Sequence, residues 1–226
     1  CYHAGWRGGL KAVESQIGLR RPADLQGVDG AEAVELWTHW LSQGDRGDRD
    51  RLVRYCAADA MALRGVTAAV LRRSFDVHAT SGNFNNHLGL PLTILRMLPR
   101  HEVLVAEMGM SARGEIAHLA AIAHPRIGIV TTVAPVHVEH LGSIEAIAAA
   151  KAELVDALPS HGVAVLNADD PRVAAMAGRC LGRVVTFGRA ADADVRVVEV
   201  ELGPDGRPTV RMVVDGVSIE TTLSMV

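Results

Sequence analysis

The sequence is poor in cysteine and has no long apolar run, and each shortage excludes a class of protein. Its three cysteines, at positions 1, 56 and 180 of 226, are odd in number and widely spaced. That spacing argues against a disulfide framework and is typical of a reducing cytoplasm. No run of about 18 or more apolar residues occurs, so we expect no membrane insertion. A net charge of −3 gives no general attraction to nucleic acid.

Aromatic residues are scarce too, at 4%, and their distribution divides the chain. Every Trp and Tyr lies in the first 55 residues, where helix-like stretches alternate with polar turns. We place a boundary near residues 64–73, between a small helical segment (1–66) and a second domain (67–226). Because the chain begins with Cys1 rather than Met, we expect a fragment or a processed product.

Apolar spacing predicts three helices in the first segment, at about 10–17, 31–42 and 51–73. Residues 44–48 are predicted to form a charged loop between the last two helices. Asp48 or Asp50 is then expected to cap the third helix.

In the second domain, strand-like and helix-like stretches alternate. This alternation predicts an α/β fold, with a mostly parallel sheet and crossover helices, closed by a C-terminal antiparallel β unit. Strands are expected at 102–107, 127–133, 163–166 and 184–187, helices at 114–123, 143–158 and 171–180, and hairpin strands at 195–201, 209–214 and 218–223.

A loop rich in Asn, Gly and Pro is predicted at residues 80–91. Its three asparagines have side chains that both donate and accept hydrogen bonds, which suits a polar ligand: Asn83, Asn85 and Asn86. An ordinary turn-rich connection explains the same composition.

Two polar motifs follow predicted strands. Glu107 lies where open α/β sheets bind ligands, and its carboxylate suits Mg²⁺, although a solvated glutamate at a strand end is an equal alternative. After the next strand, His137, Glu139 and His140 invite a zinc interpretation. Their order does not match the usual helical zinc motif and the cysteines are distant, so zinc is disfavoured.

Lysine occurs only at Lys11 and Lys151, against 21 arginines. In such a chain a merely solvated helix cation would usually be Arg, so Lys151 indicates amine chemistry, such as carbamylation by CO₂ to give an oxygen ligand. An exposed helix position is the alternative. Asn167 precedes Asp169 and Asp170, a segment that either binds a base or ribose or caps the next helix.

Five ordered runs in the second domain resemble the Mur ligase family: GNFNNHLGLPLT at 82–93, EMGM with GEI at 107–116, APVHVEHLGS at 134–143, AKAEL at 150–154 and NADDP at 167–171. The resemblance implies ATP-driven amide formation in cytoplasmic peptidoglycan-precursor synthesis, through an acyl phosphate that an amine attacks. Within the family, the runs most resemble the member that joins D-alanyl-D-alanine to a UDP-MurNAc-tripeptide.

The resemblance also implies cofactors, partners and roles. Glu107 would bind the Mg²⁺ that bridges the ATP phosphates, and His137 a second Mg²⁺ together with carbamylated Lys151. We expect these three catalytic residues to converge at the carboxyl edge of the parallel sheet. Asn167 would contact adenine, while the three loop asparagines would face the UDP-MurNAc-peptide. D-alanyl-D-alanine is the second substrate, and a monomer is expected.

The chain departs from the family in one decisive motif, because it contains no G-x-x-x-x-G-K-S/T phosphate loop. In the family that loop directly precedes the helix that here begins near Thr67. The chain also stops at Val226, before the family's carboxy-terminal domain. We therefore expect a folded central domain with weak ATP binding and little ligase turnover.

The first segment resembles the end of a ribonuclease H-like exonuclease domain, through GLKAVE at 9–14, GAEAVELW at 30–37 and YCAAD at 55–59. Tyr55 and Asp59 are one helical turn apart and can face one metal site. The resemblance implies that Asp59 binds the metal and Tyr55 positions the attacking water. The alternative function is thus a metal-dependent 3′–5′ exonuclease fragment acting on nucleic acid, and a buried Tyr beside an exposed Asp is the structural alternative.

Limited proteolysis tests the predicted boundary. A stable fragment should begin between residues 60 and 75, because about 150 residues of alternating strands and helices can bury a core alone. Gel electrophoresis with mass spectrometry of the products would identify its first residue. Degradation of both halves at equal rates would contradict a boundary there.

Overall fold

The structure, a computed structural model, describes residues 67–134, 141–202 and 208–222, together with residues 25, 36, 39, 42–48, 51 and 63–65. By their contacts the residues divide into two compact units. The first comprises 1–79, 100–105 and 226, and the second comprises 80–99 and 106–225. No described helix is long and apolar enough to cross a membrane.

The first unit contains a two-stranded parallel sheet, formed by β1 (Val77–Ala79) and β2 (Val103–Val105). Glu102 secures its start, since its carboxylate accepts a hydrogen bond from the N–H of Asp76 at 3.0 Å and its own N–H donates to the Asp76 carbonyl at 2.8 Å. Sequence analysis did not predict β1, because three residues carry no readable alternation.

The helical turn at residues 46–48 corrects the prediction that 44–48 is entirely a loop. Asp45 caps this turn, because its carboxylate accepts from the N–H groups of Gly47 at 2.6 Å and Asp48 at 3.2 Å. The predicted cap at Asp48 is therefore wrong, and Asp50 lies outside the described residues. Residues 63–65 and 67–71 are helical, as predicted.

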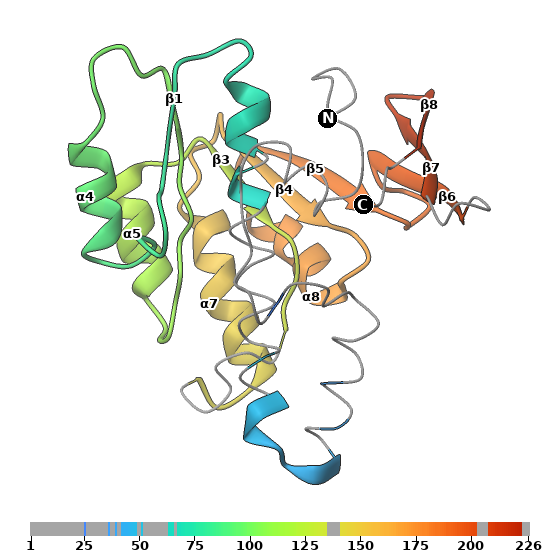
Figure 1. The fold of residues 1–226 in the computed structure, drawn as a ribbon, viewed down its shortest axis with the longest axis horizontal. Helices are drawn as coiled ribbons and strands as arrows, with labels where there is room; N and C mark the ends of the chain where they lie inside the picture. The colour runs from blue at the N-terminus through green and yellow to red at the C-terminus, as the bar shows by residue number, and fades with distance from the viewer. Residues whose placement is uncertain are drawn as a thin grey trace. The chain divides into compact units, whose positions relative to one another are not determined.

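The second unit is built on a six-stranded sheet in the order β3–β4–β5–β6–β7–β8 (Figure 1). Strands β3 to β6 pair in parallel, whereas β7 pairs antiparallel with β6 and with β8. This arrangement confirms the predicted fold class. Their bounds are β3 Ile127–Val130, β4 Val163–Asn167, β5 Arg183–Gly188, β6 Val195–Leu202, β7 Pro208–Val214 and β8 Val217–Thr222.

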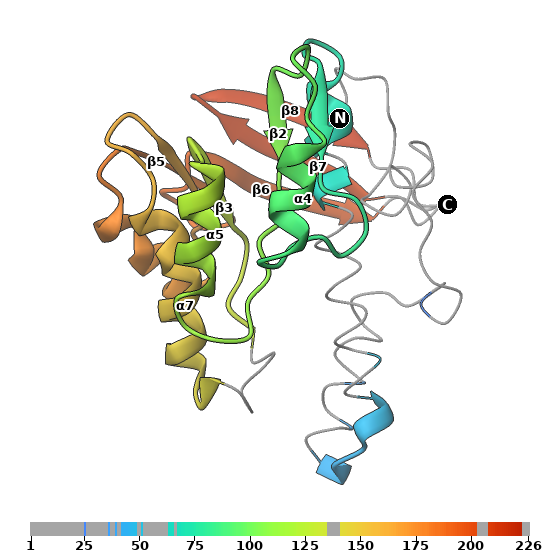
Figure 2. The same ribbon diagram turned by 90° about the vertical axis from the view of Figure 1, so that its left-hand side faces the viewer.

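Crossover helices connect the parallel strands. Helix α7 (Ile144–Asp156) links β3 to β4, and Ser143 caps it by accepting from the N–H of Ala146 at 3.1 Å. The predicted helix 171–180 is divided into α8 (Pro171–Ala174) and the 3₁₀ helix η3 (Ala175–Arg179). Helix α5 (Glu115–Ala123) packs alongside α7 (Figures 1 and 2).

The predicted single sheet is wrong in one respect. Sequence analysis placed strands 102–107 and 127–133 together, whereas β2 pairs with β1 and β3 pairs with β4 in two separate sheets. Sheet membership depends on which strands hydrogen-bond to each other, and apolar alternation within one strand does not report its neighbour.

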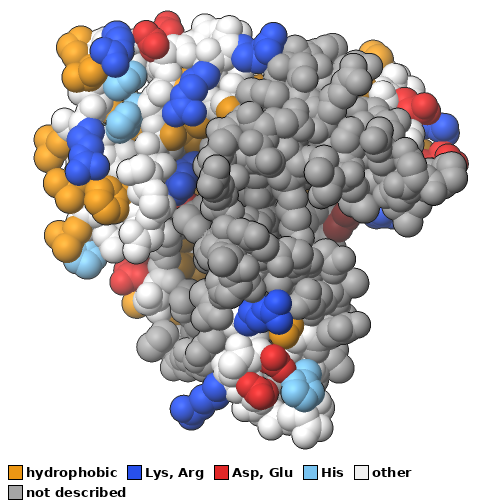
Figure 3. Space-filling model, viewed as in Figure 1, with side chains coloured by type: hydrophobic (Ala, Val, Ile, Leu, Met, Phe, Trp, Pro, Cys, Tyr) orange, Lys and Arg blue, Asp and Glu red, His pale blue; other side chains and the backbone are white. Residues whose placement is uncertain are grey.

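Helix α4 (Gly89–Leu95) begins inside the segment predicted to be a loop. The side-chain oxygen of Asn86 stabilises the start of this helix, because it accepts hydrogen bonds from the N–H groups of Leu88 at 3.1 Å and Gly89 at 2.9 Å. Hydrophobic side chains gather over α4 on the surface (Figure 3), where Leu88, Leu92 and Leu95 are exposed at helical spacing.

The turn between β7 and β8 was predicted correctly. Asp215 and Gly216 have φ values of 51° and 77°, as a type I′ hairpin turn requires. The other predicted turn, at 203–206, lies outside the described residues.

The core of the second unit lies between α7, α8 and the sheet, and its largest fully buried side chains include Ile147, Val155, Leu158, Leu166 and Val173. Substituting Leu166→Ala should reduce the free energy of unfolding by about 2–5 kcal/mol, since it leaves a cavity in β4.

Leu181→Ala is the matched control, because Leu181 is 76% exposed and should change stability by less than about 0.5 kcal/mol. Urea denaturation measures both variants. Equal losses would show that Leu166 is not in the core.

Candidate active site

Asn85 and Glu107, 22 residues apart, are joined at the centre of the candidate site. The Asn85 side-chain amide donates to Oε1 of Glu107 at 2.9 Å. The Asn85 carbonyl also accepts from the N–H of Gly109 at 2.8 Å, and the N–H of Glu107 reaches the Thr80 hydroxyl at 3.4 Å. The structure thus brings together two residues that sequence analysis proposed separately.

Two glycines allow these segments to approach each other. A Cβ on Gly109 would lie 3.0–3.2 Å from the Asn85 amide group, and one on Gly89 would lie 2.3 Å from Cα of Phe84. Any larger residue at Gly89 would therefore displace the asparagine loop.

The other two loop asparagines are exposed. Asn86 accepts from the N–H groups at the start of α4, as described above, so the structure gives it a local role. Contact of Asn83 and Asn86 with a substrate stays a prediction.

A cavity of about 730 Å³ lies beside the Asn85–Glu107 pair. Its lining comes from the asparagine loop and from residues 109–119, and includes Asn85, Met110, Arg113 and His118. This volume is within the range of small-molecule sites, and the Arg113 guanidinium favours an anionic ligand. Sequence analysis missed Arg113, although it lies directly before the GEI run.

Lys151 and Asn167 converge on the chain that leaves β3. The Lys151 ammonium donates to the Thr132 carbonyl at 2.6 Å, and the Asn167 amide donates to the Thr131 carbonyl at 2.8 Å. The Asn167 side-chain oxygen also accepts from the N–H of Asp169 at 2.9 Å. The Asn167 amide has two N–H groups, and the bond to Thr131 uses one of them. Contact of Asn167 with adenine stays a prediction.

Asp170 binds the same chain segment, residues 131–133, as a hydrogen-bond acceptor, whereas Lys151 and Asn167 bind it as donors. One carboxylate oxygen accepts from the Val133 N–H at 2.7 Å and the Thr132 hydroxyl at 3.2 Å, and the other caps α8 through the Arg172 N–H at 3.0 Å. Partial burial alone would raise the pKa of this carboxyl, but these hydrogen bonds outweigh burial and lower the pKa. The capping alternative for this segment is therefore confirmed for Asp170.

The residues present fit a magnesium ion better than they fit ATP. Glu107 offers a hard carboxylate oxygen, already oriented by Asn85, of the kind that Mg²⁺ prefers. Lys151 in its ammonium form is a hydrogen-bond donor and cannot bind a metal, so it fits only if carbamylated. ATP fits in part, since the sequence lacks the loop whose N–H groups hold the phosphates.

Several predicted residues lie outside the described part of the chain, namely His137, Glu139, His140, Tyr55 and Asp59. The convergence of Glu107, His137 and Lys151 therefore stays a prediction. Its one-sheet argument no longer applies, because β2 and β3 belong to different sheets.

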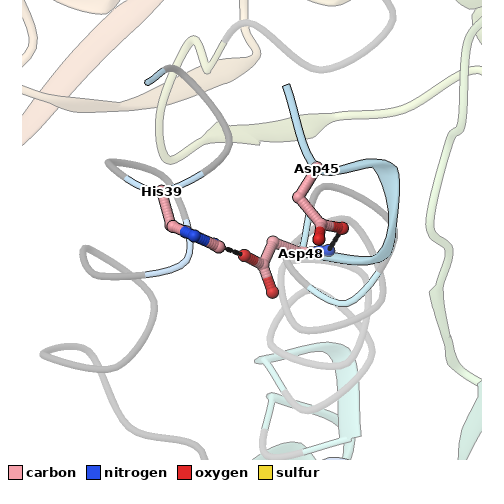
Figure 4. Close-up of side chains that lie close together, drawn as sticks. All are labelled: His39, Asp45 and Asp48. Carbon is pink, nitrogen blue, oxygen red and sulfur yellow. Dashed lines mark hydrogen bonds and ion pairs between the residues drawn. The ribbon is translucent and has the colours of Figure 1, made fainter. Parts of the chain in front are cut away.

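A second cluster, in the first unit, joins His39, Asp45 and Asp48 (Figure 4). Their ligand-type atoms all lie within 4.8 Å of one another. The His39 ring hydrogen-bonds to the Asp48 carboxylate, which raises the pKa of His39, and Asp45 is occupied as a helix cap. Local capping and one exposed ion pair account for this cluster.

Comparison with known proteins decides the family. Residues 64–226 match the model of the Mur ligase middle domain. The chain belongs to the Mur ligase family. In addition, residues 1–71 match the model of the RNase_H superfamily, so the two matched ranges share residues 64–71 of this Mur ligase chain.

Curated relatives of this Mur ligase chain are much longer. The UDP-N-acetylmuramoyl-tripeptide–D-alanyl-D-alanine ligase of Mycobacterium tuberculosis is 46% identical over 147 residues, which cover 65% of this chain and 29% of that protein. The Bacillus subtilis ligase of the same name is 41% identical over 138 residues, which cover 61% and 30%. The chain thus spans less than a third of the length of these relatives.

Solved structures agree on the Mur ligase fold. MurF ligase from Thermotoga maritima, in complex with ADP, superposes with a TM-score of 0.62 at 29% identity, covering 68% of this chain and 35% of that chain. MurF from Acinetobacter baumannii gives a TM-score of 0.62 at 23% identity, covering 73% and 42%.

Asp170→Asn should destabilise this Mur ligase domain by about 1–2 kcal/mol at pH 7, because one amide oxygen cannot serve both sets of donors. The pKa of Asp170 is lowered by folding, so its contribution is present above the unfolded pKa of about 3.9 and is lost as pH falls through the folded value. The difference between wild type and variant should therefore shrink below about pH 4.

Urea unfolding at a series of pH values measures this difference. Asp192→Asn, at an exposed aspartate, is the control and should leave stability nearly unchanged. A deficit of Asp170→Asn that stayed constant down to pH 2 would contradict the proposed charge-assisted bonds.

Proposed function

We propose that residues 67–226 are the central domain of an ATP-dependent ligase that joins D-alanyl-D-alanine to a UDP-MurNAc-tripeptide. The reaction forms an amide bond through an acyl phosphate, at the cytoplasmic stage of peptidoglycan-precursor synthesis. The observation that carries the proposal is the Asn85–Glu107 pair beside the 730 Å³ cavity. The names of the relatives support the substrates, over the 29–30% of their length that aligns.

In this proposal Glu107 holds a Mg²⁺ ion, and Asn85 fixes the direction of its carboxylate. Bound ATP and Mg²⁺ would supply an activated phosphoryl group and neutralise its charge. Lys151, once carbamylated, adds an oxygen ligand beside residues 131–133, together with His137. Asn167 contacts adenine, and the asparagine loop faces the sugar-peptide substrate.

The missing phosphate loop limits the activity of this chain. That loop would supply a lysine, a hydroxyl for Mg²⁺ and several N–H donors, and such contacts are worth about 3–4 kcal/mol each in the transition state. Because these groups act as a unit, their joint loss is not compensated by the residues that remain.

The match of residues 1–71 to the RNase_H superfamily supports a second candidate function, a metal-dependent 3′–5′ exonuclease that uses Tyr55 and Asp59. Its readout is Mg²⁺- or Mn²⁺-dependent release of nucleotides from single-stranded DNA. Loss of that release in Asp59→Asn, but not in Asp76→Asn, would assign it to this segment.

Binding and turnover together test the ligase proposal. The chain should bind UDP-MurNAc-tripeptide and, more weakly, ADP in the presence of Mg²⁺, as measured by calorimetry. With ATP, Mg²⁺, bicarbonate, the tripeptide and D-alanyl-D-alanine, phosphate release should be at least about 10²–10³-fold below that of an intact ligase. Glu107→Gln keeps the acceptor for Asn85 but removes the charge, so it should abolish the Mg²⁺ dependence of ADP binding.

Glu220→Gln is the control, because Glu220 lies in β8 and pairs with Arg211 at 3.3 Å. Binding of neither ligand by the wild-type chain would contradict the proposal. Turnover close to that of an intact ligase would instead show that another segment replaces the phosphate loop.

A further inference from the structure

Glu153 connects helix α7 to the start of helix α5. Its Oε1 accepts a hydrogen bond from the Gly114 N–H at 2.7 Å, and its Oε2 accepts from the Ala117 N–H at 3.1 Å. These donors precede Glu153 by 39 and 36 residues. The contact is therefore a bond between two packed helices and not a local cap.

The start of α5 needs such a partner. The first N–H groups of a helix have no acceptor within the helix, and they form its positive end, which favours a carboxylate. Gly114, at the N-cap, has no side chain to supply an acceptor, and its φ of 85° is a conformation that glycine adopts without strain. Glu153 supplies from α7 what the N-cap residue lacks.

This bond fixes one end of the cavity wall formed by residues 109–114. Asn85 holds the other end through its carbonyl and the Gly109 N–H, and Glu115 binds the N–H groups of Ser111 and Ala112 in between. Arg113 lies directly before Gly114, so the placement of the guanidinium that lines the cavity depends on the backbone that Glu153 holds.

We propose that Glu153 is a positioning residue, which holds the 109–114 wall and Arg113 in the shape that binds an anionic sugar-peptide. Glu153 lies two residues after Lys151, so it also ties this wall to the helix that carries that lysine. The identity of the ligand rests on the proposed function, whereas the hold on the wall does not.

Amide hydrogen exchange tests the hold on the wall in the full chain. Exchange across residues 111–117 should accelerate about tenfold or more in Glu153→Ala, and less in Glu153→Gln, which keeps one acceptor. Glu145→Gln is the matched control, because Glu145 lies on the same helix but bonds to its own backbone N–H, to Ser143 and to Arg172, and to nothing that a described contact places in α5. Unchanged exchange in Glu153→Ala would overturn the proposal.

Ligand titration separates positioning from general stability. Glu153→Gln should weaken binding of UDP-MurNAc-tripeptide about tenfold while the affinity for Mg²⁺-ADP stays unchanged. Equal loss of both affinities, or no loss of either, would overturn the positioning role. Failure of the wild-type chain to bind the tripeptide would contradict the proposed function, and hydrogen exchange would still decide whether Glu153 holds the wall.

Discussion

Backbone polar groups that no helix or strand pairs still need hydrogen-bonding partners, and in the second unit side chains supply several of them. The chain leaving β3 has its carbonyls bound by Lys151 and Asn167 and an N–H bound by Asp170. The start of α5 has its N–H groups bound by Glu153. Four residues of the family motifs, Lys151, Glu153, Asn167 and Asp170, are thus hydrogen-bonding partners of the backbone.

This dual use explains how the fold and the chemistry can separate. A charged side chain that has a partner within the protein stays hydrogen-bonded when no ligand is present, which lowers the cost of keeping it in the fold. Lys151 has the Thr132 carbonyl and Glu107 has the Asn85 amide. None of these bonds involves a phosphate loop, so a chain without that loop still needs these residues to build its loops.

Features set by a few neighbouring residues were predicted well from the sequence, whereas pairings between distant segments were not. The start of α7 at Ser143 and the turn at Asp215 follow from one or two residues that dictate the local backbone. Asp45 could have been found in the same way, since aspartate before a helical turn is a common cap. The split into two sheets could not, because strand neighbours are chosen by pairing across the whole chain.

The candidate site shows the same limit. Residue types alone identified Glu107, Lys151 and Asn167 as chemically suited, but the Asn85–Glu107 bond joins segments 22 residues apart and carries no signal in either segment. Arg113, in the turn before α5, and Glu153, on α7, were overlooked because arginine and glutamate side chains are usually solvated.

The separate sheets change how the two halves of the site can be coordinated. Sequence analysis expected shared strand order to align Glu107 with Lys151, yet β2 and β3 do not pair. Within the second unit, residues 106–114 continue directly into α5, and α5 packs on α7, which carries Lys151. Helix packing, and not strand pairing, therefore connects the segment that follows Glu107 to the helix that carries Lys151. Interlocking side-chain ridges set the crossing angle of packed helices, and the bond of Glu153 to Gly114 adds a directional contact at the start of α5 that apolar packing does not provide.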